Sequence, residues 1–64
     1  MKKITLRAAR VNAGLKQEEA AKKIGVNLRT IQKWENYESF PSVKRVPAIE
    51  ETYGVTYDAI NFLP

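Results

Sequence analysis

The chain has 64 residues with neither cysteine nor histidine, which excludes disulfide bonds, thiolate metal sites and the general base that enzymes use most often. A chain of this length buries only about 60% of its unfolded surface, so we expect one small, simple domain over residues 1–64. The net charge of +4 is unevenly distributed, because residues 1–33 carry +7 and residues 34–64 carry −3.

The first predicted helix spans residues 5–13, and Gly14 supplies its C-terminal stop. Successive residues of a helix are about 100° apart, so residues spaced three or four apart share one side, and an apolar side is expected to face inward. That side carries Leu6, Ala9, Arg10 and Ala13. An arginine on an inward face needs a carboxylate partner, because a buried unpaired charge is costly.

The second predicted helix covers residues 17–24, and Gly25 ends it in a left-handed conformation that only glycine adopts at low cost. Its inner side consists of small and apolar residues, namely Ala20, Ala21 and Ile24. Two adjacent alanines allow another helix to approach closely. Residues 17–36 are therefore predicted to form a helix, a tight turn and a second helix packed across it.

The third predicted helix covers residues 28 to about 36, with Asn27 as its N-cap. Its buried side carries Ile31 and Trp34. The opposite side, within an arc of roughly 140°, carries Leu28, Arg29, Gln32, Lys33 and Asn36. This polar face suits DNA reading, although a solvated helix face has the same composition. Glu35 borders the buried side and is the candidate partner of Arg10.

A loop at residues 37–41 leads to a fourth predicted helix, which Ser42 can cap and which ends near Tyr53. Pro47 admits two interpretations, because a proline inside a helix removes a hydrogen bond and clashes with the preceding turn. Either the helix bends at Pro47, or residues 42–46 form a separate turn and Pro47 takes the first helical position. The second interpretation is preferred.

A fifth helix is predicted for residues 57–63, with Thr56 as its cap and Asp58 in its first turn, where a negative charge suits the helix dipole. These segments together predict a compact all-α fold of five helices. The apolar residues at the C-terminal end either close the core or form a dimer contact. They are Ile60, Phe62 and Leu63.

Over residues 4–63 the chain resembles the Cro/CI-type helix-turn-helix domain of phage repressors and bacterial regulators, which implies a lambda-repressor-like five-helix fold. The matching motif opens with Arg10, Gly14, Lys16 and Gln17. It continues with Ala21, Gly25, Val26, Ile31, Trp34, Glu35 and Asn36. The sequences PSV at 41–43 and YGVTYDAI at 53–60 also match the last two helices of the family.

Three positions depart from the family pattern. Ala20 stands where the family often has leucine, and Pro47 is atypical. Tyr37 stands where glycine usually follows the WEN ending, so Asn36 is expected to take the left-handed conformation instead.

The resemblance implies that the third helix enters the major groove of DNA with its N-terminal end deepest. Arg29 can then donate two hydrogen bonds to guanine, and Lys33 can also favour guanine. Gln32 can pair with adenine. Leu28 offers no hydrogen bond, so its expected contact is a thymine methyl group.

The same resemblance implies contacts with the DNA backbone. Gln17 would bind a phosphate through its side chain and backbone N–H, helped by the helix N-terminus. Lys16 stands where Ser or Thr would cap better, which fits either a phosphate contact or an ordinary exposed lysine. Further candidates are Asn36, Lys44 and Arg45. The family also links its first and third helices by the pair that here is Arg10 and Glu35.

We therefore expect a sequence-specific DNA-binding transcriptional regulator, Cro- or repressor-like, that binds a near-palindromic operator on double-stranded DNA as a homodimer. The basic N-terminal half suits such a polyanion, although solubilising charge gives the same imbalance. The alternative is an antitoxin-like protein-interaction module, which should have more apolar or acidic residues on the third helix. We expect a cytoplasmic protein with no enzyme activity, cofactor, metal or membrane association.

Overall fold

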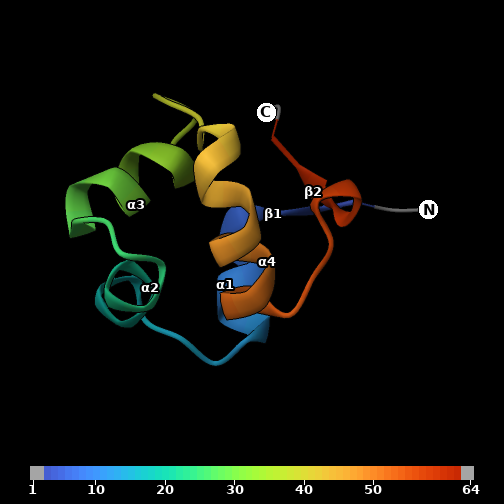
Figure 1. Cartoon of the computed structure of the whole chain (residues 1–64), viewed down its shortest axis with the longest axis horizontal. Coiled ribbons are helices and arrows are strands. Elements are labelled where there is room, and N and C mark those ends of the chain that lie inside the picture. Colours follow the sequence, from blue (N-terminus) through green and yellow to red (C-terminus); the bar gives the residue numbers. More distant parts are fainter. Residues whose placement is uncertain (1–2, 63–64) are drawn as a thin grey trace.

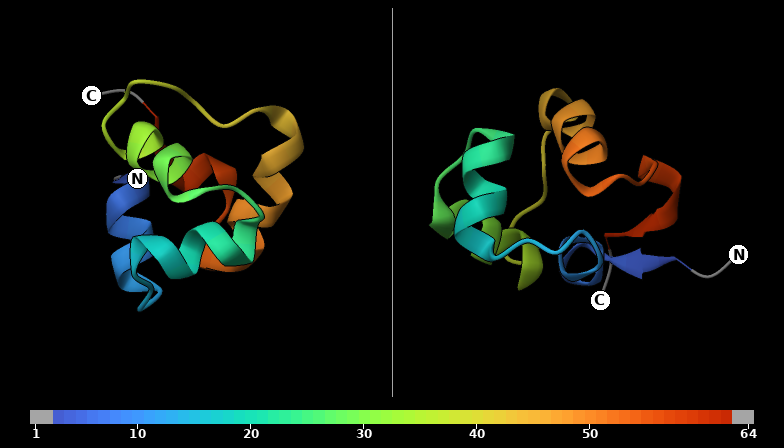
Figure 2. Two further views of the ribbon diagram at one scale, coloured as in Figure 1. Left: turned by 90° about the vertical axis from the view of Figure 1, so that its left-hand side faces the viewer. Right: turned by 90° about the horizontal axis from the view of Figure 1, so that it is seen from below.

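The computed structural model describes residues 3–62, and this part of the chain contains four α-helices and one two-stranded sheet (Figure 1). The helices are α1 (Leu6–Asn12), α2 (Gln17–Ile24), α3 (Leu28–Glu35) and α4 (Val46–Tyr53). The strands are β1 (Ile4–Thr5) and β2 (Ile60–Asn61). Single 3₁₀ turns, Val43–Arg45 and Tyr57–Ala59, precede α4 and β2. Helix α2 packs against both α3 and α4 (Figure 2). With four α-helices and one short strand pair, the described residues are mostly helical.

Side-chain caps set the starts of α1 and α3. The Oγ1 of Thr5 accepts a hydrogen bond from the N–H of Ala8 at 3.0 Å. The Oδ1 of Asn27 likewise accepts from the N–H of Thr30 at 2.8 Å. Gly25 ends α2 with a φ of 91°, in the left-handed region that a residue without Cβ reaches at low cost. The turn between α2 and α3 therefore has both predicted features, a left-handed Gly25 and an Asn27 N-cap.

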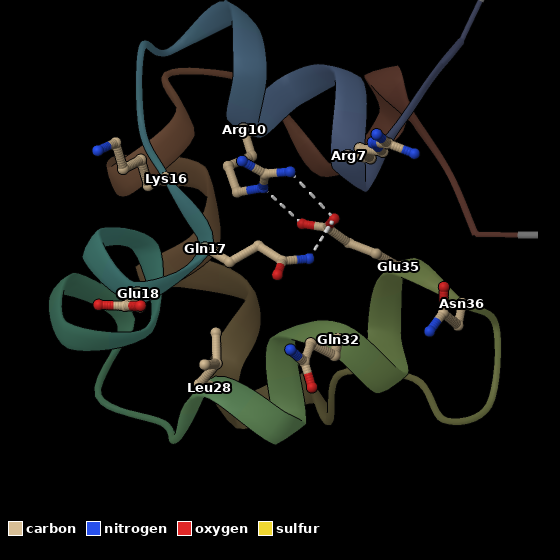
Figure 3. A pocket seen from close by; sticks show the side chains of 9 residues that line it. All are labelled: Arg7, Arg10, Lys16, Gln17, Glu18, Leu28, Gln32, Glu35 and Asn36. Atoms are coloured by element: carbon tan, nitrogen blue, oxygen red, sulfur yellow. Dashed lines mark hydrogen bonds and ion pairs between the residues drawn. The ribbon is translucent and has the colours of Figure 1, made fainter.

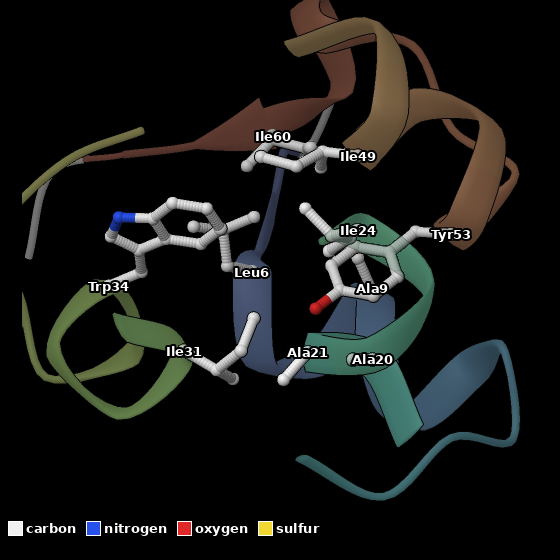
Figure 4. Close-up of a cluster of buried hydrophobic side chains, with 10 residues drawn as sticks. All are labelled: Leu6, Ala9, Ala20, Ala21, Ile24, Ile31, Trp34, Ile49, Tyr53 and Ile60. Carbon is white, nitrogen blue, oxygen red and sulfur yellow. The ribbon is translucent and has the colours of Figure 1, made fainter. Parts of the chain in front are cut away.

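The hydrophobic core lies where the four helices and β2 meet (Figure 4). Its members are Leu6, Ala9, Ala20, Ala21, Ile24, Ile31, Trp34, Ile49, Tyr53 and Ile60. Ala9 and Ala20 are completely buried, which shows that the helices approach closely at both positions. Trp34 is 6% exposed, so its ring has no free face on which a base could stack.

The turn after α3 corrects one prediction, because Tyr37 and not Asn36 takes the left-handed conformation, with a φ of 62°. Asn36 keeps a φ of −92°, since its N–H still bonds to the last turn of α3. The N–H of Glu38 reaches back to the carbonyl of Lys33 at 2.9 Å, which closes a Schellman turn around Tyr37. A non-glycine residue in this conformation costs about 1–2 kcal/mol.

The segment around Pro47 follows the preferred interpretation, with a shift of one residue. Val43–Arg45 form a separate 3₁₀ turn, and α4 begins at Val46 with Pro47 as its second residue. The N–H groups of the first helical turn have no partner within the helix, so the missing N–H of proline costs nothing there. Gly54 ends α4 with a φ of 67°.

The prediction of a fifth helix over residues 57–63 is wrong within the described residues, which end at residue 62. After the turn Tyr57–Ala59 the chain becomes extended, and β2 pairs in parallel with β1, Ile4 opposite Ile60 and Thr5 opposite Asn61. Ile60 reaches the core in this conformation and is 2% exposed. The described residues are therefore mostly helical, with four α-helices and one short strand pair instead of five helices.

The ends of this segment also differ from the prediction. Thr56 makes no side-chain cap; the N–H of Tyr57 instead donates to the Oε2 of Glu50 at 2.7 Å. Because Ile60 is a core residue, it is not available for the predicted dimer contact. Phe62 is half-buried, with its ring centroid 5.0 Å from that of Tyr57, and the predicted contact of Leu63 lies outside the described residues.

Replacing Ile60 with alanine should lower the free energy of unfolding by about 2–5 kcal/mol, because it removes a buried side chain and leaves a cavity. Urea denaturation followed by circular dichroism measures this change. Val43, 88% exposed, provides the control: Val43→Ala should stay within about 0.5 kcal/mol of the unmodified protein. An Ile60→Ala protein of unchanged stability would contradict the position of β2.

Candidate nucleic-acid interface

An open groove of about 640 Å³ lies between α1, the start of α2 and α3 (Figure 3). Three helices therefore contribute side chains to one surface. The lining residues are Arg7, Arg10, Lys16, Gln17, Glu18, Leu28, Gln32, Glu35 and Asn36. Five of the predicted contact residues are thus brought together, and four others lie outside the groove.

A hydrogen-bonded ion pair connects α1 to α3 in this groove. The Nε of Arg10 donates to the Oε2 of Glu35 at 2.7 Å, and its Nη2 donates to Oε1 at 3.2 Å. The Nη1 of Arg10 donates to the carbonyl of Leu15 at 2.8 Å. The side chains of Arg10 and Glu35 are only 11% and 5% exposed. The hydrogen bond to Glu35 raises the pKa of the Arg10 guanidinium further above its ordinary value.

Gln17 joins α2 to the same pair. Its Nε2 donates to the Oε1 of Glu35 at 3.1 Å, so that oxygen accepts from both Gln17 and Arg10. With this amide nitrogen directed at Glu35, the amide oxygen of Gln17 points the other way (Figure 3). The amide nitrogen carries two N–H groups, and the one not bonded to Glu35 can still donate to a phosphate. At the start of α2, the donors available to a phosphate are therefore this N–H of Gln17 and the backbone N–H groups of the first turn.

The exposed face of α3 divides into two stripes. Leu28, Gln32 and Asn36 follow one another at four-residue intervals and line the groove. Arg29 and Lys33 are each one residue further along, about 100° around the helix, and lie outside the groove. Arg29 is exposed and Lys33 is half-buried. Of the four predicted base-contacting residues, Leu28 and Gln32 therefore line the groove, and the cations Arg29 and Lys33 lie beside it.

Lys16 lies on the groove at the N-cap of α2, with its side chain exposed. Its backbone N–H donates to the Oε1 of Glu19 at 2.8 Å, which is one half of a capping box. The lysine ammonium has no acceptor and cannot complete the other half. Glu18, also exposed, adds a negative charge to the same end of the groove.

The candidates after α3 occupy different places. Asn36 lines the groove, and its Nδ2 donates to the Oε2 of the exposed Glu38 at 3.5 Å. Lys44 and Arg45 are exposed in the turn before α4 and lie outside the groove. The guanidinium of Arg45 reaches the turn between α2 and α3, since a Cβ placed on Gly25 would lie 3.8 Å from its Nη1.

Sequence reasoning missed Arg7 and Glu18 as residues of this surface. Arg7 lies three residues before Arg10, and that spacing places two side chains on one side of a helix. The spacing therefore could have indicated Arg7 once Arg10 was assigned an inward position. Glu18 lines the groove as well, and nothing in its spacing along the sequence indicates this position.

Among the described residues, no cluster of histidine, cysteine or carboxylate side chains could hold a metal ion. In the same residues, 3–62, no helix has the length and apolar character needed to span a membrane.

A family model described as helix-turn-helix matches residues 6–60 of the chain. That segment contains all four helices and the groove-lining residues. No curated protein and no solved structure gives a significant match to the chain.

Replacing Glu35 with alanine should lower the free energy of unfolding by about 3 kcal/mol, because the largely buried Arg10 then has no counter-charge. Arg10→Met should also destabilise. The double variant should lose less stability than the two single variants added together, since it leaves no unpaired charge. A urea-denaturation double-mutant cycle tests this, and strictly additive losses would show that the pair is not coupled.

Burial raises the pKa of the Tyr53 phenol from 10.0 to about 12, and the nearby Glu35 carboxylate adds to the shift. The folded chain therefore disfavours ionised Tyr53. Below about pH 10, Tyr53 is protonated in both the folded and the unfolded chain, so it leaves the free energy of unfolding unchanged. As the pH rises from about 10 towards about 12, Tyr53 ionises first in the unfolded chain, and the free energy of unfolding therefore falls. Melting temperatures at increasing pH should fall less steeply for Tyr53→Phe. Parallel curves for the two proteins would contradict this.

Proposed function

The chain belongs to the helix-turn-helix family of DNA-binding regulators, and we propose that it binds a specific site on double-stranded DNA by inserting α3 into the major groove. The observation that carries this proposal is the α3 face itself. It combines an exposed Leu28, the amide of Gln32 and the cations Arg29 and Lys33, beside a groove that collects further polar groups.

Each residue on this face has a distinct role in the proposed complex. Arg29 donates two parallel hydrogen bonds to the O6 and N7 of a guanine, and Lys33 favours a second guanine. Gln32 pairs with the N6 and N7 edge of an adenine. Leu28 is 36% exposed at the start of α3 and contacts a thymine methyl group.

Contacts with phosphates hold α3 in register. Lys16 and the backbone N–H groups of Gln17 and Glu18 face one phosphate at the N-terminus of α2, where the helix dipole favours a negative charge. Asn36, Lys44 and Arg45 serve other phosphates beyond the end of α3. In this arrangement one N–H of the Gln17 amide positions Glu35, and the other N–H donates to the phosphate together with the backbone.

We further propose that the protein is a Cro- or repressor-like regulator that binds a near-palindromic operator as a homodimer. Two α3 helices about 34 Å apart would enter successive major grooves on one side of the duplex. With Ile60 in the core, the exposed Tyr57 and the half-buried Phe62 stacked on it are the aromatic pair for the dimer contact.

Selection from random duplexes, followed by titration of the selected duplex over a salt series, tests the function. We expect one enriched site and an affinity that falls steeply with salt. Arg29→Ala should lose about 1–3 kcal/mol of discrimination at a single guanine position. Lys23→Ala is the matched control, because it removes the same charge from the groove between α2 and α4.

Two outcomes would overturn the proposal. One is that no sequence is enriched over random DNA. The other is that Arg29→Ala and Lys23→Ala change the preferred sequence equally little. Either result, together with capture of a protein partner by α3, would support the alternative of an interaction module.

A further inference from the structure

Arg7 on α1 is the lining residue of the groove to which no role has been given. It is exposed and lies one helical turn before Arg10. Figure 3 shows Arg7 and Asn36 at one end of the groove and Lys16 at the other. Helix α1 therefore contributes a cation to the end of the surface that lies furthest from Lys16.

Within residues 3–62, the guanidinium of Arg7 keeps its hydrogen-bonding capacity free. Both oxygens of Glu35, a carboxylate on the same groove, accept hydrogen bonds from Arg10 and Gln17. Among residues 3–62, no hydrogen bond or ion pair engages the Arg7 side chain. Its charge and five N–H donors are thus directed at solvent on the surface proposed to meet DNA.

The charges at this end of the groove show why a cation is needed there. Glu35 neutralises Arg10, and Asn36 is uncharged. The amide of Asn36 also donates to Glu38, so an exposed carboxylate stands beside it. A phosphate approaching Asn36 therefore meets a negative charge. Among the groove-lining residues, Arg7 is the unpaired cation at this end that offsets it.

We infer that Arg7 binds a phosphate of the DNA backbone at the Asn36 end of the groove, so that α1 is a third DNA-contacting helix beside α2 and α3. The inference rests on the DNA binding proposed above. A planar guanidinium suits this role, because two of its N–H groups can bind two phosphate oxygens at once. Arg7 then fixes the register of α3 and reads no base.

The test is the salt dependence of binding to the selected duplex, measured by fluorescence anisotropy for the unmodified protein, Arg7→Gln, Arg7→Lys and Lys23→Gln. Each lost phosphate contact should reduce the slope of log affinity against log salt by about 0.9 per bound chain. Arg7→Gln should show this reduction, with equal loss on matched and mismatched sites. Arg7→Lys should restore the slope, and Lys23→Gln should leave it unchanged.

Arg7 is exposed, so thermal melts should show Arg7→Gln as stable as the unmodified protein. An unchanged slope for Arg7→Gln, or an equal change for Lys23→Gln, would overturn the inference while leaving sequence-specific binding intact. If the unmodified protein binds DNA without any preferred site, the proposed specificity fails, and the same slopes measured on random duplex still decide the role of Arg7. Absence of DNA binding overturns both.

Discussion

The ion pair of Arg10 with Glu35, extended by Gln17, is the interaction on which the arrangement of the first three helices depends. Removing two charges from water costs several kcal/mol per ion, and only good geometry with further hydrogen bonds recovers it. Here the guanidinium bonds to Glu35 and to the carbonyl of Leu15, while Glu35 also accepts from Gln17. These bonds can form together only when α1, α2 and α3 hold one mutual orientation.

The apolar core and the polar network of Arg10, Glu35 and Gln17 hold α1, α2 and α3 together from two different sides. On one side, Ala20 and Ala21 of α2 and Ile31 of α3 belong to the buried core, and the two small side chains allow α2 to pack closely against its neighbours α3 and α4. On the other side, the Arg10–Glu35 pair joins α1 to the last turn of α3. The groove between these helices is therefore a stable feature of the fold.

The sequence is a good guide where structure is determined locally and a poor one where it is not. The bounds of α2 and the start of α3 depend on Asn27 and Gly25, whose backbone preferences act within one turn. The mistaken fifth helix has a non-local cause, since Ile60 pairs with Ile4 at the other end of the chain. In the candidate interface, helical periodicity shows that Arg10 needs a carboxylate. It does not show that Gln17 directs its amide to Glu35, because that contact requires the packing of two helices.

The parallel pairing of β1 with β2 has a mechanical consequence. The two strands lie away from α2 and α3 (Figures 1 and 2), and they join positions 4 and 60 near the opposite ends of the chain. In a parallel pair, the start of the first strand and the end of the second lie at opposite ends of the ladder. Tension applied between the two ends of the chain would therefore shear the ladder, loading its hydrogen bonds together instead of opening them one at a time. The hydrogen bonds between β1 and β2 must therefore break before a pulling force can unfold the helices.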